Sequence, residues 1–331
     1  MPSLLDTLDL IAERRFDLIH VAAPGPLGIT AAIAGMARGL PVVGAYHTEL
    51  GDYARQLSGD ALVGDIVETL VRWFYERCAA VTVPSRATAA ALRSRGYQIG
   101  RLEVVRHGVD CARFRPDLRD LALREALGGG RSLILYAGRV SREKGLDRLT
   151  EQYRAMRERR QDAHLVVVGD GPYRTEMAAA LGDAATFTGF LHGEEFARTM
   201  ASADVFAFPS QTDTLGLVVL EAQASGVPAV VFARGGPSEG IVPGASGLVA
   251  PEDDDAAFMA AVELLLDHPE QRERMGQAGR AFAERQTWEG VYAALAGLYL
   301  DIAAGNARKG GDQQASPAMP PLLAAAFGQP A

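Results

Sequence analysis

Two carboxylates eight positions apart are the residues of this 331-residue chain whose spacing points most directly to chemistry. The segment 210–226 (SQTDTLGLVVLEAQASG) places Asp213 in an expected loop and Glu221 about two turns into the helix that follows. A helix start carries free amides and partial positive charge, so it can seat an anion or sugar oxygens. The amides between the acids belong to Thr214, Leu215, Gly216 and Leu217. Alternatively, Asp213 is an N-cap and Glu221 a helix-face carboxylate, and these residues alone leave both open.

Two cations form a second candidate group, in the segment 138–145 (GRVSREKG) after an expected strand. Gly138 opens this segment, and Arg139 and Lys144 could neutralise a phosphate that gains charge as its bond breaks. Lysine occurs only at positions 144 and 309, and every other basic residue is arginine. Because an ammonium and a guanidinium are not equivalent, this lysine suggests a specific task. The alternative is a solvated surface pair.

Three weaker candidates also follow expected strands. His47 ends the run PVVGAYH, although a lone histidine is more often structural than functional. Gly169 begins the turn GDGP, whose default interpretation is a tight turn between strand and helix. The loop 234–237 (RGGP), with Glu239, either lines a cleft or is a flexible turn. Ser85 lacks the nucleophile elbow G-x-S-x-G and is expected to cap a helix.

The elements that must position these residues alternate between strand and helix, which is typical of parallel α/β sheets. In the first half we expect strands at 17–21, 41–46, 80–84 and 102–106, with helices at 4–14, 28–38, 62–77 and 85–95. A linker at 114–117 precedes strands at 132–137, 164–168, 184–188, 205–208, 228–232 and 247–249. Residues 254–304 are expected to be helical. Ligands are expected at the carboxyl ends of the strands.

Composition limits the class of protein. The length suggests about two domains, and the net charge of -8 argues against nucleic acid as a partner. Two cysteines, Cys78 and Cys111, are too few for a disulfide framework and fit the cytoplasm. No apolar run approaches the roughly 20 residues that cross a bilayer, so any membrane contact is expected to be peripheral. No cluster has metal-ligand spacing, so we expect neither a metal nor a cofactor.

Asp213 and Glu221, within TDTLGLVVLEAQASG, resemble the E-x7-E signature of the retaining glycosyltransferases of family 4. With supporting motifs the resemblance covers residues 1 to about 300. It implies an α/β fold of the GT-B type, with two facing Rossmann-like domains. We therefore expect an acceptor-side domain at 1–115, a nucleotide-sugar domain at 116–287, a helix at 288–304 that can return to the first domain, and a disordered tail at 305–331.

The resemblance also assigns roles to the acidic and basic residues. Asp213 and the amides of 214–217 would hold the donor sugar, Glu221 would bind the ribose hydroxyls, and Arg139 and Lys144 would grip the diphosphate. His47 matches the family's HT position, whose histidine contacts the sugar near the reacting carbon. His20, in DLIHV, is expected to be structural.

The nucleotide base would lie near Gly169 and Leu191, with Phe190 and His192 as further candidates. The sequence departs from the family pattern in two places. Asp213 replaces the first Glu, which keeps the charge and shortens the reach. His107, in HGVD, stands where the family has Asn, so the role of that Asn is not carried over.

The expected reaction is retaining transfer of a sugar from a nucleoside diphosphate donor to a hydroxyl of a lipid or glycan acceptor. The sequence of residues 212–226 most resembles that of bacterial GDP-mannose-dependent α-mannosyltransferases, with UDP-glucose and related UDP-sugars as competing donors. The protein would work in the cytoplasm, with the inner membrane face as an option. Two rivals are a GT-B nucleotide-sugar epimerase and a non-catalytic nucleotide-sugar-binding remnant.

The beginning of the chain also departs from the family. Family members place a strand, a Gly-rich loop and further βα units before the equivalent of PDLIHV, and this chain starts at the helix before that strand. We therefore expect a truncated first domain, with Leu18–Val21 as an apolar edge strand without its ladder partner. A start site placed too far downstream or a fragment would explain it.

Overall fold

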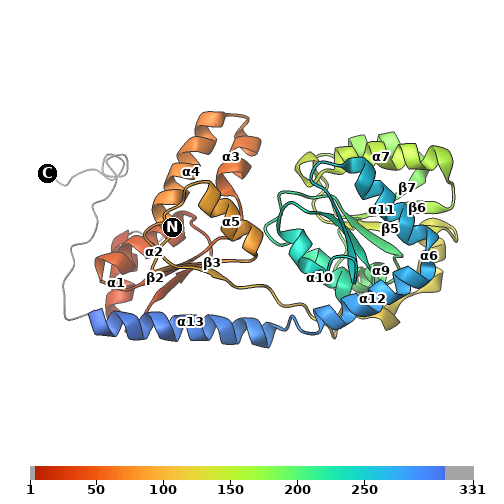
Figure 1. Cartoon of the computed structure of the whole chain (residues 1–331). Helices are drawn as coiled ribbons and strands as arrows, with labels where there is room; N and C mark the ends of the chain where they lie inside the picture. The colour runs from red at the N-terminus through yellow and green to blue at the C-terminus, as the bar shows by residue number, and fades with distance from the viewer. Residues whose placement is uncertain (1–3, 310–331) are drawn as a thin grey trace.

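The computed structural model describes residues 4–309 and divides them between two parallel sheets that helices cover (Figure 1). In the first domain the strands follow chain order: β1 (Ile19–Val21), β2 (Val42–Ala45), β3 (Ala80–Val83) and β4 (Leu102–Val104). Its helices are α1 (Leu4–Glu13), α2 (Pro26–Ala37), α3 (Leu50–Ser58), α4 (Ala61–Tyr75) and α5 (Arg86–Ser94). Among the described strands β1 pairs only with β2, so it lies at the sheet edge, where the sequence placed it.

Local sequence signals explain most of these helices. Ser85 begins α5 as expected, because its hydroxyl accepts a 3.0 Å hydrogen bond from the Thr88 amide. Helix α3 was not predicted. It has only nine residues and ends at Gly59, whose φ of 68° is left-handed. It forms a hairpin with α4 that stands above the sheet (Figure 1), in a segment for which the sequence predicts neither a helix nor a strand.

The second domain has the strand order of a doubly wound nucleotide-binding sheet. Its strands are β5 (Ser132–Ala137), β6 (Ala163–Val168), β7 (Ala185–Gly189), β8 (Val205–Phe208), β9 (Ala229–Phe232) and β10 (Gly247–Ala250), in the order β10-β9-β8-β5-β6-β7. The chain therefore winds one way from β5 and the other way from β8. Ligands bind at such a switch point, outside the carboxyl ends of the two central strands.

Helices connect these strands and cover both faces. They are α6 (Leu121–Gly128), α7 (Leu146–Arg159), α8 (Arg174–Leu181), α9 (Gly193–Ala201) and α10 (Leu217–Ala224). Short 3-10 turns lie at η1 (Pro116–Leu118), η2 (Arg142–Lys144), η3 (Gly182–Ala184) and η4 (Gly236–Gly240). The expected linker at 114–117 thus runs into a short turn.

A buried carboxylate ties the linker side of the domain to its central strands. The Asp204 side chain is 2% exposed and accepts bonds from the Leu133 amide at 2.8 Å, Arg119 at 2.7 Å and Arg124 at 2.9 Å. Burial alone would raise its pKa, but the amide and the two guanidinium groups hold the pKa below its usual value. The carboxylate is therefore ionised and fully bonded, which fixes the start of β5 against β8.

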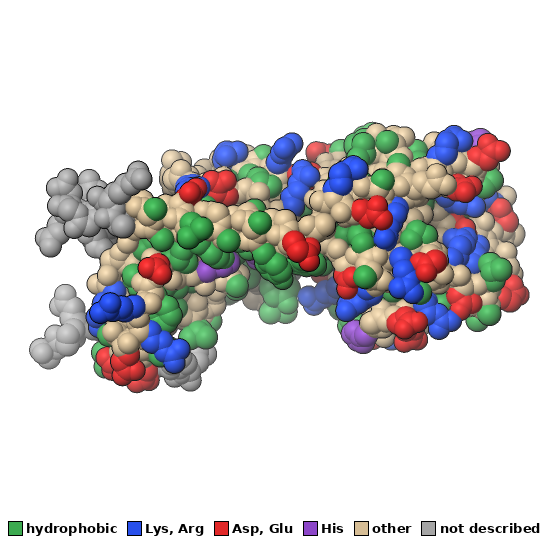
Figure 2. All heavy atoms as spheres, turned by 90° about the horizontal axis from the view of Figure 1, so that it is seen from below, with side chains coloured by type: hydrophobic (Ala, Val, Ile, Leu, Met, Phe, Trp, Pro, Cys, Tyr) green, Lys and Arg blue, Asp and Glu red, His purple; other side chains and the backbone are tan. Residues whose placement is uncertain are grey.

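Three helices follow β10: α11 (Asp255–Asp267), α12 (Pro269–Ala283) and α13 (Trp288–Lys309). Helix α13 runs back along the first domain, where Leu298 and Ile302 pack in one apolar cluster with Val43 and Ala80 (Figure 1). Charged side chains crowd the second domain, whereas the band over α13 carries few (Figure 2). The long helix therefore packs on the first domain through apolar side chains.

The expected boundary between this helix and a disordered tail at residue 305 was wrong. The helix continues through Gly305 to Lys309, because the residues after Gly305 still permit a helix. Asn306 donates a 3.2 Å bond to the Gly39 carbonyl. The rest of the expected tail, 310–331, lies outside the described residues. Within residues 4–309 no helix combines the length and apolar character needed to cross a membrane.

Two segments cross between the domains and are bound to each other. The Val109 amide, after β4, donates a 2.9 Å bond to the Gln286 carbonyl before α13. A Cβ on Gly108 would lie 2.5 Å from the Trp288 nitrogen, so only glycine allows the two backbones to approach this closely. The two crossings therefore move together.

Candidate active site

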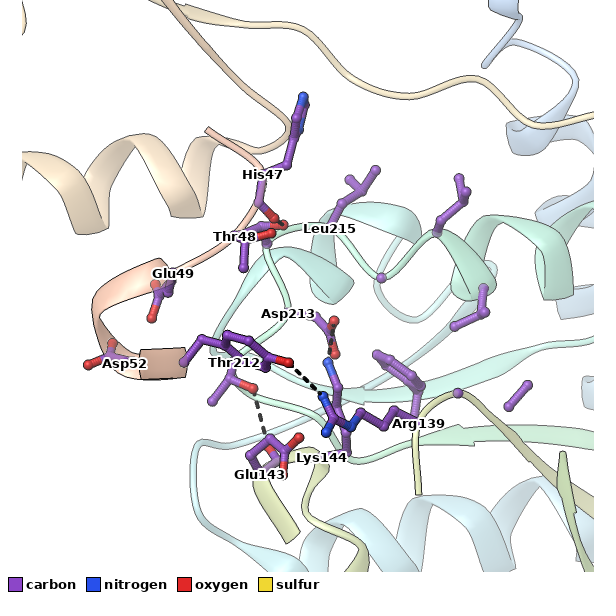
Figure 3. A pocket seen from close by; sticks show the side chains of 18 of the residues that line it. His47, Thr48, Glu49, Asp52, Arg139, Glu143, Lys144, Thr212, Asp213 and Leu215 are labelled. Atoms are coloured by element: carbon purple, nitrogen blue, oxygen red, sulfur yellow. Dashed lines mark hydrogen bonds and ion pairs between the residues drawn. The ribbon is translucent and has the colours of Figure 1, made fainter. Parts of the chain in front are cut away.

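A cavity of about 810 Å³ lies between the two domains, at the carboxyl ends of β2, β5 and β8 (Figure 3). It brings together nine of the residues that the sequence singled out. These are His47, Gly138, Arg139, Lys144, Asp213, Thr214, Leu215, Gly216 and Leu217. Segments up to 170 residues apart in sequence therefore meet at the switch point, as expected for a ligand site.

An ion pair between Lys144 and Asp213 crosses the switch point. Lys144 Nζ lies 2.7 Å from Asp213 Oδ1, and the two side chains are 21% and 23% exposed (Figure 3). The other carboxylate oxygen, Oδ2, is buried and has no hydrogen-bond partner among the described residues. A buried carboxylate oxygen without a donor is costly, so a ligand hydroxyl is the natural partner for it.

Arg139 belongs to the second domain and faces the first domain across the cavity. Its backbone is held by Tyr136, whose buried hydroxyl donates a 2.8 Å bond to the Arg139 carbonyl. Its guanidinium lies 3.5 Å from the Tyr53 hydroxyl and 5.8 Å from the centre of that ring. Gly138 has a φ of 150°, which allows the chain to turn directly after β5. Arg139 and Lys144 thus place two cations on one wall.

The amide-rich loop between the two acids is shaped by a left-handed glycine. Gly216, with φ 71°, precedes α10, so the first amides of this helix have no intrahelical acceptors. The loop is bound across the cleft, because Thr214 Oγ1 donates a 2.9 Å bond to the His47 carbonyl. Leu215, Gly216 and Leu217 all line the cavity. The helix start therefore faces the cavity, next to Asp213.

Two histidines form the first-domain side of the cavity. The ring centres of His47 and His107 lie 5.2 Å apart in an edge-to-face arrangement. Burial lowers the pKa of both imidazoles, and the neighbouring His47 lowers the pKa of His107 further. Both rings are therefore neutral near pH 7 and can donate or accept a hydrogen bond.

Three candidates for the nucleotide side do not line this cavity: Glu221, Gly169 and Leu191. Glu221 lies in α10, where burial raises its pKa to about 7 and only Arg113 opposes that shift. Gly169 packs against the segment 138–145, since a Cβ on Gly169 would lie 1.9 Å from the Gly138 carbonyl oxygen. Leu191 packs at the margin of the second-domain core.

The two aromatic neighbours of Leu191 also lie away from this cavity. Phe190 is 67% exposed and stacks on His192, with 6.4 Å between the ring centres. An exposed aromatic pair on a loop after β7 offers a flat surface on which a planar ring could stack.

The loop after β9 contacts the first domain as well as the cavity. Arg234 lines the cavity. One oxygen of Glu239 accepts a 2.8 Å bond from the Ala87 amide at the start of α5, and the other lies 3.3 Å from Arg106. Because Glu239 joins a helix N-terminus and a cation of the facing domain, this loop holds the two domains together.

Glu49, Asp52 and Tyr53, in and before α3, line the cavity but were missed from the sequence. Burial raises the pKa of Glu49 to about 7, and the hydrogen bond with Asp52 acts in the same direction. The three-residue spacing of the two acids after the HT motif was the available signal, because it places both on one helix face. It was not used, since no helix was expected there.

Within residues 4–309, His, Cys, Asp and Glu side chains form no group of three that could hold a metal ion. His20 Nδ1 lies 2.7 Å from the Tyr299 hydroxyl, which supports a structural role. Cys78 is buried and Cys111 half-buried, and both are free thiols.

The two facing parallel α/β domains, with a cavity between them at the switch point of the second sheet, define the GT-B class of glycosyltransferases. Residues 123–282 match the family model described as glycosyl transferases group 1, and residues 2–113 match the model of Glycosyltransferase Family 4. The chain belongs to this family of glycosyltransferases.

Characterised relatives and solved structures agree with this assignment. The chain is 33% identical over 307 residues to a GDP-mannose-dependent alpha-mannosyltransferase of Corynebacterium glutamicum, covering 92% of this chain and 71% of the relative. It is 32% identical over 287 residues to the sulfoquinovosyl transferase SQD2 of Arabidopsis thaliana, covering 84% of this chain and 55% of that relative. The chain thus spans little more than half of the second protein.

The fold itself is shared with solved structures at lower identity. A sucrose-phosphate synthase of Thermosynechococcus elongatus superposes with a TM-score of 0.76 at 24% identity, covering 91% of this chain and 77% of that one. HepE of Anabaena, solved with UDP and glucose, gives a TM-score of 0.74 at 18% identity, covering 90% and 81%. Both likenesses show the fold.

Proposed function

We propose that this protein is a retaining hexosyltransferase that works without a metal ion and binds a nucleoside diphosphate sugar in the cavity between its domains. The observation that carries the proposal is the Lys144–Asp213 pair. One carboxylate oxygen of Asp213 is bonded to the ammonium at 2.7 Å, and the other is buried without a partner. A cation for phosphate and an acceptor for a sugar hydroxyl thus lie side by side at the helix start.

In the proposed reaction Arg139 and Lys144 bind the donor diphosphate, while Asp213, the 214–217 amides and His47 orient the sugar. The bond between the anomeric carbon and the diphosphate oxygen breaks. The departing phosphate takes the proton of the acceptor hydroxyl, and the acceptor oxygen bonds to the anomeric carbon on the same face. The two cations stabilise the negative charge that develops on the leaving phosphate, so they act where charge changes most.

We assign the donor as GDP-mannose, with UDP-glucose as the competing choice. Support comes from relatives named as GDP-mannose-dependent mannosyltransferases, two of which share 33% identity with this chain over most of its length. The domain assignment follows the site: 1–115 as the acceptor side, 116–287 as the donor side and 288–304 as a bridging helix. Glu221 would bind the ribose, and the Gly169 and Leu191 loops would border the base.

The acceptor is proposed to be a hydroxyl of a lipid or glycan, reached at the cytoplasmic face of a membrane through peripheral contact. Support comes from relatives named as phosphatidylinositol monomannoside mannosyltransferases. Exposed apolar side chains on the first domain, such as Leu57 at 72% exposure and Leu62 at 64%, agree with contact to an apolar partner.

Calorimetric titration with GDP-mannose and UDP-glucose, followed by release of nucleotide in the presence of octyl mannoside, tests the proposal. We expect saturable binding of one donor and an α-linked product by NMR. Binding without nucleotide release would favour the non-catalytic remnant, and isomerised donor without an acceptor would favour the epimerase. Failure to bind either donor would contradict the proposal.

The raised pKa of Glu221 gives the ribose assignment a pH signature. With a pKa of about 7, the carboxylate is mostly protonated at pH 6 and mostly ionised at pH 8. Only the ionised form accepts both ribose hydroxyl bonds, so donor affinity should rise roughly tenfold from pH 6 to pH 8. The diphosphate of a nucleotide sugar does not titrate in this range. Because Glu49 in the cavity has a pKa in the same range, the decisive comparison is with Glu221→Gln, whose affinity should change less between pH 6 and pH 8. Equal changes in that variant and in the unmodified protein would refute the ribose role.

A further inference from the structure

His107 occupies a place where the proposed sugar site meets the crossing between the domains. It follows β4, lines the cavity together with His47, and contacts that ring edge to face at 5.2 Å between centres. Neither imidazole makes a side-chain hydrogen bond within residues 4–309, and His107 Nδ1 is buried. The His47 side chain is exposed at the cavity, and His107 is the one described aromatic ring in contact with its imidazole, so this ring contact is what can orient it.

The His107 ring also contacts helix α13. Trp288, the first residue of α13, contacts the His107 ring at 6.0 Å and stacks on Tyr292 at 5.9 Å. The backbone around Gly108 is pressed against Trp288, with 2.5 Å available where a Cβ would lie. The backbone beside His107 is thus held against the start of α13, and the His107 ring lies in contact with both His47 and Trp288.

We infer that His107 is a positioning residue for His47: held by Trp288 at the interdomain crossing, its ring fixes the His47 imidazole at the sugar end of the cavity. The inference rests on the proposed function, in which His47 contacts the donor sugar. Near neutral pH the contact is between uncharged rings, because burial keeps the pKa values of both imidazoles low. A third imidazole, His20 on β1, also has its pKa lowered by burial and by His47, so it adds no charge there.

A double-mutant cycle tests whether His107 acts through His47. The variants are His107→Ala, His47→Ala and their combination, assayed by nucleotide release from GDP-mannose, with kcat and KM measured separately. We expect His107→Ala to lower kcat about tenfold while the donor KM changes little, because ring orientation and not binding is lost. In the His47→Ala background His107→Ala should have no further effect. His107→Phe, which restores a flat ring, should recover most of the lost kcat.

Several outcomes would overturn the inference. Equal losses in both backgrounds would mean that His107 acts through the hinge or through stability. A harmless His47→Ala, with normal donor binding, would remove the sugar role of His47 and this inference together, leaving the diphosphate assignment intact. Failure of the unmodified protein to bind a donor would instead overturn the proposed function.

Control variants separate a loss of activity from a failure to fold. Exposed His268, at the end of α11, gives His268→Ala as the control histidine outside the cavity, and thermal unfolding checks every variant. If His107→Ala does not fold, Trp288→Leu removes the ring that contacts His107, and Trp288→Phe keeps an aromatic ring there. Trp288→Leu should then reproduce the lower kcat. A normal kcat in that variant would contradict the inference that Trp288 holds the His107 ring in place.

Discussion

Lys144→Ala is expected to lower kcat/KM for sugar transfer on the order of 100- to 1000-fold, as removal of one preorganised donor to a developing oxyanion does in other enzymes. Two effects act in the same direction. The ammonium that would stabilise the leaving phosphate is lost, and Asp213 Oδ1, bonded to it at 2.7 Å, keeps its negative charge without a counterion. Steady-state nucleotide release and donor calorimetry measure the two effects separately.

Arg142→Ala is the matched control for this prediction, because Arg142 belongs to the same short turn as Lys144. Its guanidinium lies 2.5 Å from Glu176 and 4.7 Å from the Tyr173 ring centre, and Arg142 does not line the cavity. We expect it to retain near-normal kcat/KM. Lys144→Arg should recover part of the activity, since it keeps the charge but changes its shape. Equal losses in Lys144→Ala and Arg142→Ala would show that only overall charge matters.

The sequence was sufficient to bring Gly138, Lys144 and Asp213 to one cavity, because the segments that carry them follow strands. Parallel strands end at one edge of a sheet, so Gly138, Lys144 and Asp213 had to approach one another once β5 and β8 were recognised as neighbours. His47 follows β2 in the other sheet, so its place in this cavity depends on how the two domains face each other. Their hydrogen bonds, and the roles that we propose for them, depend on tertiary geometry that periodicity does not contain.

The parts that were missed share a physical cause. Helix α3 has nine residues and is held by packing on α4, where Gly51 lies against Glu68 and Gly64 against Arg55. Short helices gain their stability from such tertiary contacts and not from intrinsic propensity, so local sequence gives a weak signal. The cavity residues Glu49 and Asp52 were missed with it.

The sequence could not distinguish glycines that contact a ligand from glycines that allow two backbone segments to approach each other closely. Gly169 was a candidate for nucleotide contact, and the structure gives it an additional reason: its Cα faces the Gly138 carbonyl across the ends of β5 and β6. A glycine next to a ligand and a glycine next to another backbone look identical in sequence. Only the distance to the neighbouring backbone segment in the folded protein distinguishes the two kinds of glycine.

Gly236 offers a sharp test of such packing, because it lies against the loop that carries Thr214 and Leu215. A Cβ at Gly236 would lie 2.0 Å from the Thr214 oxygen, 2.3 Å from the Thr214 carbonyl carbon and 2.6 Å from the Leu215 nitrogen. All three are backbone atoms, so no side-chain rotation can relieve the overlap. Gly236→Ala must therefore displace the loop whose amides are proposed to hold the donor sugar.

We expect Gly236→Ala to lower kcat/KM on the order of 100-fold, because a shift of about 1 Å in a positioning loop is enough for such a loss. The free energy of unfolding should fall by about 1–3 kcal/mol, the usual cost of overpacking. Gly100→Ala is the control, because a Cβ at Gly100 meets nothing within 4 Å. Nucleotide-release kinetics and denaturant unfolding of both variants measure the two effects.

The relation between the two effects decides what the loop does. If the loss in kcat/KM exceeds what the fraction of unfolded protein explains, the 214–217 amides must be held in place for transfer. A Gly236→Ala protein with full activity and a clearly lowered unfolding free energy would mean that the loop can move without consequence, and the amides would then lose their assigned contact with the sugar. Gly100→Ala should leave both quantities near their original values, since an open glycine outside the cleft constrains neither the loop nor the core.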